Sequence, residues 1–115
     1  MTKKRKSSET YFHAAPEMYN CAQSVLKGFQ TEFSISDEKV EEFRAFGGGR
    51  AENGICGALY AANFLMEKMG KPKLDDAFKE KVSYVKCRDI KGNKACSCPS
   101  CVRIADELVS LKMEK

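Results

Sequence analysis

The sequence lacks most of the features that identify common classes of enzyme and metal protein. Its only histidine is His13, which lies in a predicted linker, so we expect no ligand role for it. No Cys-x-x-Cys-His motif is present, which excludes covalent attachment of c-type haem. No second Cys-x-x-Cys or histidine pair accompanies the C-terminal cysteines, as a zinc ribbon requires. No general base or nucleophile–histidine pair is evident, so turnover of a small substrate is not predicted.

Long apolar segments are also missing. No apolar run approaches the roughly 20 residues of a membrane span, so we expect no membrane partner. The basic residues 3–6 are followed by the polar residues 7–10, not by an apolar stretch, and no twin-arginine pair occurs. A secretory signal is therefore not expected, and we predict a cytoplasmic protein.

The positive net charge is confined to the N-terminus. Of the net charge of +4, residues 3–6 supply all four charges, which leaves 16 basic and 16 acidic residues elsewhere. A basic tail of this kind is more often a solvated arm than a nucleic-acid contact, so nucleic-acid binding is not expected. We interpret residues 1–10 as a disordered basic tail and residues 11–115 as a single helical redox domain.

The apolar pattern predicts an all-α fold, a single-domain bundle of about five helices. Apolar residues recur at three- and four-residue spacing, and no alternating strand pattern or internal repeat is found. Short connections between such helices are typical of a bundle. The predicted helices cover residues 16–29, 36–46, 53 or 54 to 69, 75 to a C-terminal end at Cys87, and 99 onward.

A glycine run precedes the third predicted helix. Residues 47–49 are all glycine, and Cys56 follows just inside the helix, beside Gly57. The backbone N–H groups and the positive helix end there favour a Cys56 thiolate. Phosphate binding is disfavoured because no Gly-Lys-Ser/Thr and no preceding strand are present. We interpret the glycine run as the turn that brings Cys56 toward the other cysteines.

Cysteine is abundant in this otherwise unremarkable composition. The six cysteines are Cys21, Cys56, Cys87, Cys96, Cys98 and Cys101. In a reducing compartment, clustered cysteines more often bind metal or perform redox chemistry than form structural disulfides. The densest group, residues 96–101, has a spacing that suits a shared metal or a redox pair. The competing interpretation is that the cysteines are small buried hydrophobes.

The predicted helices place the cysteines where they can meet. Cys21 and Cys101 lie on the apolar faces of the first and last helices. Cys56, Cys87 and Cys98 lie at helix ends, which are expected to converge at one end of the bundle. Four thiolates gathered there are able to hold a cluster or a metal.

Five short pieces of the chain resemble a known family. They are NCAQSVL at 20–26, FGGG at 46–49, CGA at 56–58, CR at 87–88 and CPSCVRIA at 98–105. Together, in this order, they resemble the putative redox-active protein family named for its C-GCAxxG-C-C cysteine pattern. The resemblance implies an all-helical domain. It also implies four key cysteines, namely Cys21, Cys56, Cys87 and Cys98.

The resemblance also implies a cofactor. Related domains occur in split-Soret-type cytochromes, where four cysteines resemble an iron–sulfur site, so a [2Fe–2S] cluster is the first expectation. The chain departs from the pattern at Ala61, where the family has glycine, and in having Cys96 and Cys101 as extra cysteines. These two are substitutes for the fourth ligand, although the spacing to the following residues favours Cys98.

We therefore expect a redox-active protein that binds an iron–sulfur cluster for electron transfer or redox sensing. Its expected partner is another redox protein, and a homodimer is left open. One alternative is a thiol–disulfide protein that uses Cys56 with Cys21, or Cys98 with Cys101. Another is a zinc-binding helical interaction module, and a third is a helical adaptor without cofactor.

Overall fold

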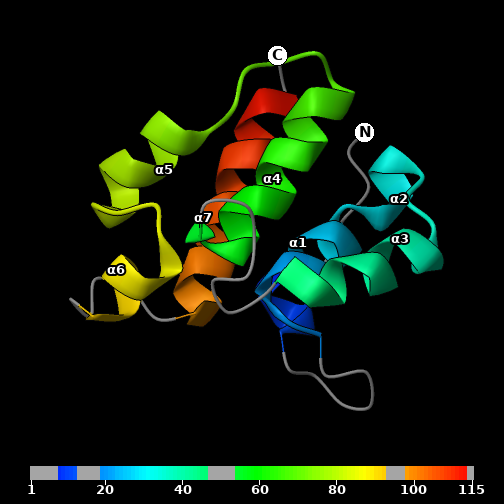
Figure 1. Cartoon of the computed structure of the whole chain (residues 1–115). Helices are drawn as coiled ribbons and strands as arrows, with labels where there is room; N and C mark the ends of the chain where they lie inside the picture. The colour runs from blue at the N-terminus through cyan, green and yellow to red at the C-terminus, as the bar shows by residue number, and fades with distance from the viewer. Residues whose placement is uncertain (1–7, 13–18, 47–53, 93–97, 114–115) are drawn as a thin grey trace.

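The computed structural model describes residues 8–12, 19–46, 54–92 and 98–113, and over these ranges it contains helices and no strand (Figure 1). The all-α prediction is confirmed. None of the helices described has the length and apolar character needed to cross a membrane. The elements are the 3₁₀-helices η1 (Ser8–Tyr11) and η2 (Phe43–Phe46), and the α-helices α1 (Cys21–Gly28), α2 (Gln30–Phe33), α3 (Asp37–Glu42), α4 (Gly57–Lys68), α5 (Asp75–Val82), α6 (Cys87–Gly92) and α7 (Cys98–Met113).

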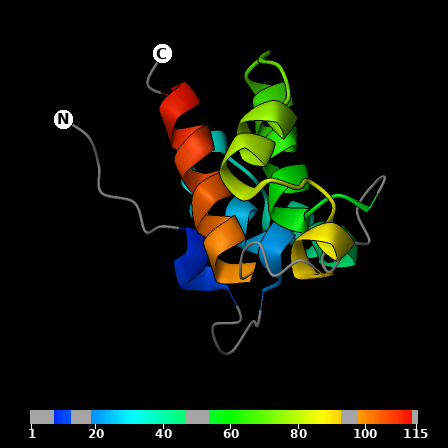
Figure 2. The ribbon, with the colours of Figure 1, turned by 90° about the vertical axis from the view of Figure 1, so that its left-hand side faces the viewer.

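The core lies where α1, α4 and α7 pack against one another. Figure 2 shows α4 and α7 side by side, with η1 beside the beginning of α7. The inner face of α4 is completely buried at Leu59, Ala62 and Leu65. Ala61 is buried as well, so the methyl group that replaces the glycine of the family pattern lies within the packed interior.

The first α-helix begins later than predicted. The apolar spacing placed its start at Pro16, which lies outside the described residues, whereas α1 starts at Cys21. The reason is a capping box: Asn20 Oδ1 accepts from the Gln23 N–H at 2.8 Å, and Gln23 Oε1 accepts from the Asn20 N–H at 3.1 Å. Cys21 is therefore the first residue of a helix.

The region from 36 to 46 is helical, as predicted. Ser36 caps α3 by accepting a hydrogen bond from the Lys39 N–H at 3.1 Å. The last turn tightens into η2. The glycine run at 47–49, interpreted from the sequence as a turn, lies outside the described residues.

Cys87 begins a helix instead of ending one, and this corrects the sequence prediction. The preceding helix α5 ends at Val82, because Ser83 adopts a left-handed conformation with φ of 83°. The chain then extends through residues 84–86 before α6 begins at Cys87.

The N-terminal element η1 belongs to the fold. Ser8 is fully buried, and its N–H and Oγ both donate to Asp106 Oδ2 on α7, at 2.8 and 2.5 Å. Ser8 also lies directly against Gly28, where an added Cβ would overlap Ser8 Oγ. The described fold therefore starts before residue 11, where the sequence placed the domain boundary.

Candidate metal and redox site

Three cysteines meet in the interior and form what we term the thiol cluster: Cys21, Cys56 and Cys101. Their side chains are buried, at 8%, 5% and 3% exposed. The Cys56 thiol is in hydrogen-bonding contact with both of the others. All three are thiols and none forms a disulfide. One sulfur thus comes from each of the three core helices: the start of α1, the N-cap of α4 and the first turn of α7.

Backbone pairing places the start of α6 beside this cluster. The Cys56 N–H donates to the Val85 carbonyl at 2.7 Å, and Ile55 forms an antiparallel bridge with Lys86. Cys87 follows directly and opens α6. Cys87 therefore follows Val85, the residue that accepts the hydrogen bond from Cys56, by two positions in the chain.

The outcome for the predicted site residues is as follows. The structure brings together Cys21 and Cys56, two of the four expected ligands, with Cys101, which the sequence offered as a substitute. Cys98 opens α7 one turn before Cys101. The side chains of Cys87 and Cys98, and the whole of Cys96, lie outside the described residues.

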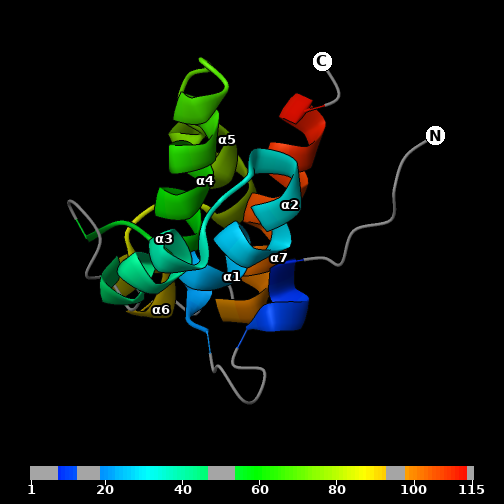
Figure 3. The ribbon, with the colours of Figure 1, turned by 90° about the vertical axis from the view of Figure 1, so that its right-hand side faces the viewer.

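Four of the helices that the structure describes begin at a cysteine or directly after one. They are α1, α4, α6 and α7, and Figures 1 and 3 show their starts gathered at the lower end of the molecule. The first-turn N–H groups of a helix carry partial positive charge, which acidic side chains often balance. The first turns of α1, α4 and α7 contain no acidic residue, and α6 contains Asp89.

The protonation of Cys56 differs from the sequence expectation. The hydrogen bond with Cys101 is the main cause that raises the pKa of Cys56, and burial adds to it, to a value of about 12. Contacts with the Cys21 thiol and the Leu59 backbone N–H lower the pKa, but by less. The Leu59 N–H at the helix start therefore acts in the predicted direction. The neighbouring thiol and burial outweigh it, and without a bound metal Cys56 is a protonated thiol at neutral pH.

We expect this shift to make the metal-free protein sensitive to alkaline pH. The pKa of Cys56 is 9.0 without perturbation and about 12 in the fold. The folded state thus retains a proton that the unfolded chain loses, and the free energy of unfolding falls as pH rises from about 9 toward 12. Urea midpoints measured across this range should fall more steeply for wild type than for Cys56→Ser. Parallel curves would contradict the prediction.

The described thiols do not by themselves form a metal cage. Over the described ranges, no group of three or more His, Cys, Asp or Glu has an arrangement that could hold a metal ion. Among the remaining cysteines, Cys87 and Cys98 are the first residues of α6 and α7.

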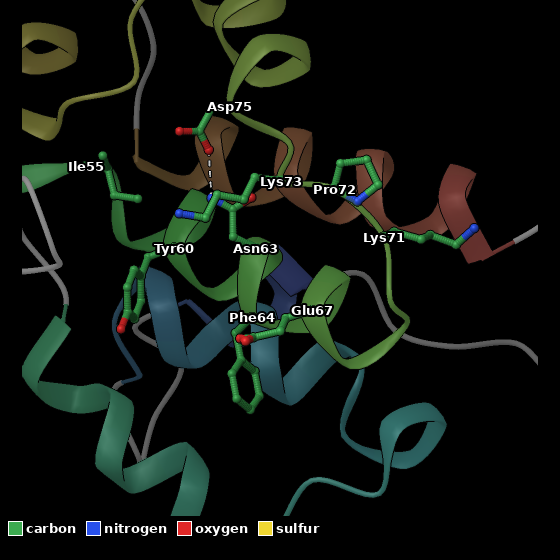
Figure 4. Close-up of a pocket in the computed structure, with 9 residues that line it drawn as sticks. All are labelled: Ile55, Tyr60, Asn63, Phe64, Glu67, Lys71, Pro72, Lys73 and Asp75. Atoms are coloured by element: carbon green, nitrogen blue, oxygen red, sulfur yellow. Dashed lines mark hydrogen bonds between the residues drawn. The ribbon is translucent and has the colours of Figure 1, made fainter.

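A separate pocket of about 480 Å³ lies on the outer face of α4, and the sequence did not predict it (Figure 4). Tyr60 and Phe64 line it together with the connection from α4 to α5. Its Asn63 donates to Asp75 Oδ1 and accepts from the Leu74 N–H, both at 2.7 Å. These bonds fasten α5 to α4. None of the described residues that line this pocket is a cysteine, so Cys21, Cys56 and Cys101 lie outside it.

Comparison with known proteins agrees with the cysteine pattern. The family model described as "Putative redox-active protein (C_GCAxxG_C_C)" matches residues 19–111, a range that includes all six cysteines. No curated protein and no solved structure matches the chain. The match spans the described fold from the residue before the α1 cap to near the end of α7. The chain therefore belongs to the C_GCAxxG_C_C family of putative redox-active proteins.

Proposed function

We propose that this protein binds an iron–sulfur cluster through four cysteines at the starts of α1, α4, α6 and α7, and uses it for electron transfer or redox sensing. The observation that supports the proposal is the thiol cluster. Three buried sulfurs from three helices give a soft donor set, which favours iron–sulfur and zinc over oxygen-seeking metals. Membership of a redox-active family favours iron over zinc.

The chemistry of the surrounding residues fits such a group. Metal binding replaces thiol protons, so the cost of keeping several thiolates together in the interior would be offset by the metal charge. The helix starts direct N–H groups toward a group that carries net negative charge with four thiolates. When bound, the cluster would supply one-electron chemistry, and the protein would hold it away from water.

Two kinds of observation support the proposed ligands: the cysteine pattern of the family and the contacts in the structure. Cys21 and Cys56 are supported by both the family pattern and their contact. Cys87 is supported by the pattern and by the backbone pairing beside Cys56. The remaining ligand would come from α7, where Cys98 and Cys101 lie one turn apart. A [2Fe–2S] cluster is our first expectation, and another redox protein is the proposed electron partner.

Thiol–disulfide exchange is less well supported. Such chemistry requires an accessible cysteine with a lowered pKa. Cys56 is 5% exposed and its pKa is raised to about 12. A buried thiol with a raised pKa is a poor nucleophile. These properties favour a metal-binding role for the described thiols over thiol–disulfide exchange.

Metal analysis of the full chain tests the proposal. Protein purified without oxygen should contain iron and acid-labile sulfide in comparable amounts, about two of each per chain for a [2Fe–2S] cluster. Colourless protein loaded with zinc would support the interaction module instead. Metal-free protein with two thiols that titrate reversibly would support dithiol chemistry.

A further inference from the structure

The pocket on the outer face of α4 has the size and the lining of a small-molecule site. Its volume of about 480 Å³ lies within the range of about 300–1,000 Å³ that is usual for ligand pockets. Apolar surface comes from Ile55, Tyr60, Phe64 and Pro72, and charged side chains come from the end of α4, the connection that follows it and the start of α5. A ligand here does not depend on the proposed function, because none of the described lining residues is a cysteine.

The aromatic wall of the pocket is held in place from behind. Tyr60 and Phe64 are four residues apart in α4, and Figure 4 shows both rings on the same side of the helix. The buried ring of Phe43 packs against both, with centroid distances of 5.7 Å to Tyr60 and 5.1 Å to Phe64. Rings whose positions are fixed before binding lose little side-chain entropy when a flat aromatic molecule packs against them.

The charges around this wall favour an anion over a cation. The ammonium groups of Lys39 and Lys68 lie 5.6 and 5.4 Å from the centre of the Phe64 ring, so they would repel a further cation. Within the part of the chain that the structure describes, neither Lys68 nor Lys73 forms an ion pair. The pocket and its rim therefore carry positive charge that a ligand is able to balance.

The carboxylates of the lining leave Lys73 as the place for that anion. The Asp75 carboxylate accepts a hydrogen bond from the Asn63 amide at 2.7 Å, which partly satisfies it. In Figure 4, Glu67 lies beside Phe64, and Lys73 lies apart from it on the side of Asn63. A negatively charged group beside Lys73 would thus avoid Glu67, while an attached ring reaches the aromatic wall.

We propose that this pocket binds a small aromatic anion, a planar ring that carries a carboxylate or a similar acidic group. The ring packs against Tyr60 and Phe64, and the acidic group pairs with the Lys73 ammonium group. Because Lys73 is exposed, the ion pair contributes modestly, and most of the affinity comes from the apolar contact.

Titration of the full chain with three probes, followed by nitrogen–proton NMR spectra, tests the proposal. The probes are 1-naphthoate, which has the ring and the charge, its neutral amide, which has the ring alone, and acetate, which has the charge alone. We expect naphthoate to bind with a Kd of about 1 mM or lower and to shift the signals of the pocket residues. The amide should bind about three-fold more weakly, and acetate should cause no saturable shift.

A matched pair of lysine variants assigns the charge contact. Lys73→Gln should weaken naphthoate binding about three-fold and leave binding of the amide unchanged. Lys81→Gln is the control, because Lys81 is an exposed lysine of α5 that is not among the described lining residues. It should bind both probes as wild type does.

The proposal is overturned if naphthoate causes no saturable shifts, or if the shifts fall outside α4 and the connection that follows it. Equal affinities for naphthoate and its amide would also overturn it, because the anion would then contribute nothing. An equal loss of naphthoate affinity in Lys73→Gln and Lys81→Gln would show an effect of net charge and would exclude Lys73 as the specific partner.

Discussion

Replacing Cys56 with serine is expected to abolish cluster binding while the helical fold remains. Cys56 is the residue through which the thiol cluster is connected, because its thiol contacts both Cys21 and Cys101. Serine nearly preserves the side-chain volume and is able to hydrogen bond with the remaining thiols, but its hydroxyl is a poor ligand for iron in place of a thiolate. We expect iron and sulfide per chain to fall at least about ten-fold, since even a change behind a metal ligand costs 10–100-fold in affinity.

The measurement is iron and sulfide analysis after purification without oxygen, together with circular dichroism. Cys96→Ser is the comparison variant, because it makes the same change in a cysteine outside the family's four-cysteine pattern. Unchanged iron in a folded Cys56→Ser protein would show that the cofactor, if bound, is held elsewhere.

A second large effect is expected on stability when Asp106 is replaced with alanine. Asp106 is 4% exposed and accepts two hydrogen bonds from the fully buried Ser8. Removing the carboxylate leaves both Ser8 donors without this acceptor in the interior. A buried donor left without an acceptor costs about 1–3 kcal/mol, and we expect the free energy of unfolding to fall by about 3 kcal/mol.

Urea unfolding with an unchanged slope measures this loss. Glu107→Ala is the control, because Glu107 is the next residue on α7 but is exposed, with only a 4.0 Å ion pair to Arg103. That exposed pair is expected to contribute less than about 0.5 kcal/mol. An Asp106→Ala protein as stable as the Glu107→Ala protein would show that the contact of η1 with α7 does not stabilise the fold.

Local sequence patterns predict most of the helices. The features that they do not predict depend on contacts between residues far apart in the chain. Ser36 is a strong N-cap, and the helix that it starts was predicted correctly. The capping box at Asn20 and Gln23 is visible in the sequence, but Pro16 is also typical of a first helical turn and predicts an earlier start. The burial of Ser8 depends on a carboxylate 98 residues away, which no local pattern indicates.

In the candidate site, too, local sequence signals predict some features and tertiary contacts determine the others. The apolar spacing of the last helix correctly predicted that Cys101 faces inward, whereas its contact with Cys56 depends on how α4 and α7 pack. The expected thiolate at Cys56 rests on two local features of the helix start, its backbone N–H groups and the helix dipole. Burial and a neighbouring thiol, both tertiary effects, reverse the direction of the pKa shift.

Stepwise reduction of the wild-type protein tests the central claim most directly. The full chain, purified without oxygen, is titrated with dithionite and followed by visible absorption and electron paramagnetic resonance. A cluster held by the cysteines at the starts of α1, α4, α6 and α7 predicts coloured protein that bleaches reversibly, with a paramagnetic signal that appears on reduction and is absent from Cys56→Ser. Colourless protein with no signal in either state would contradict the account.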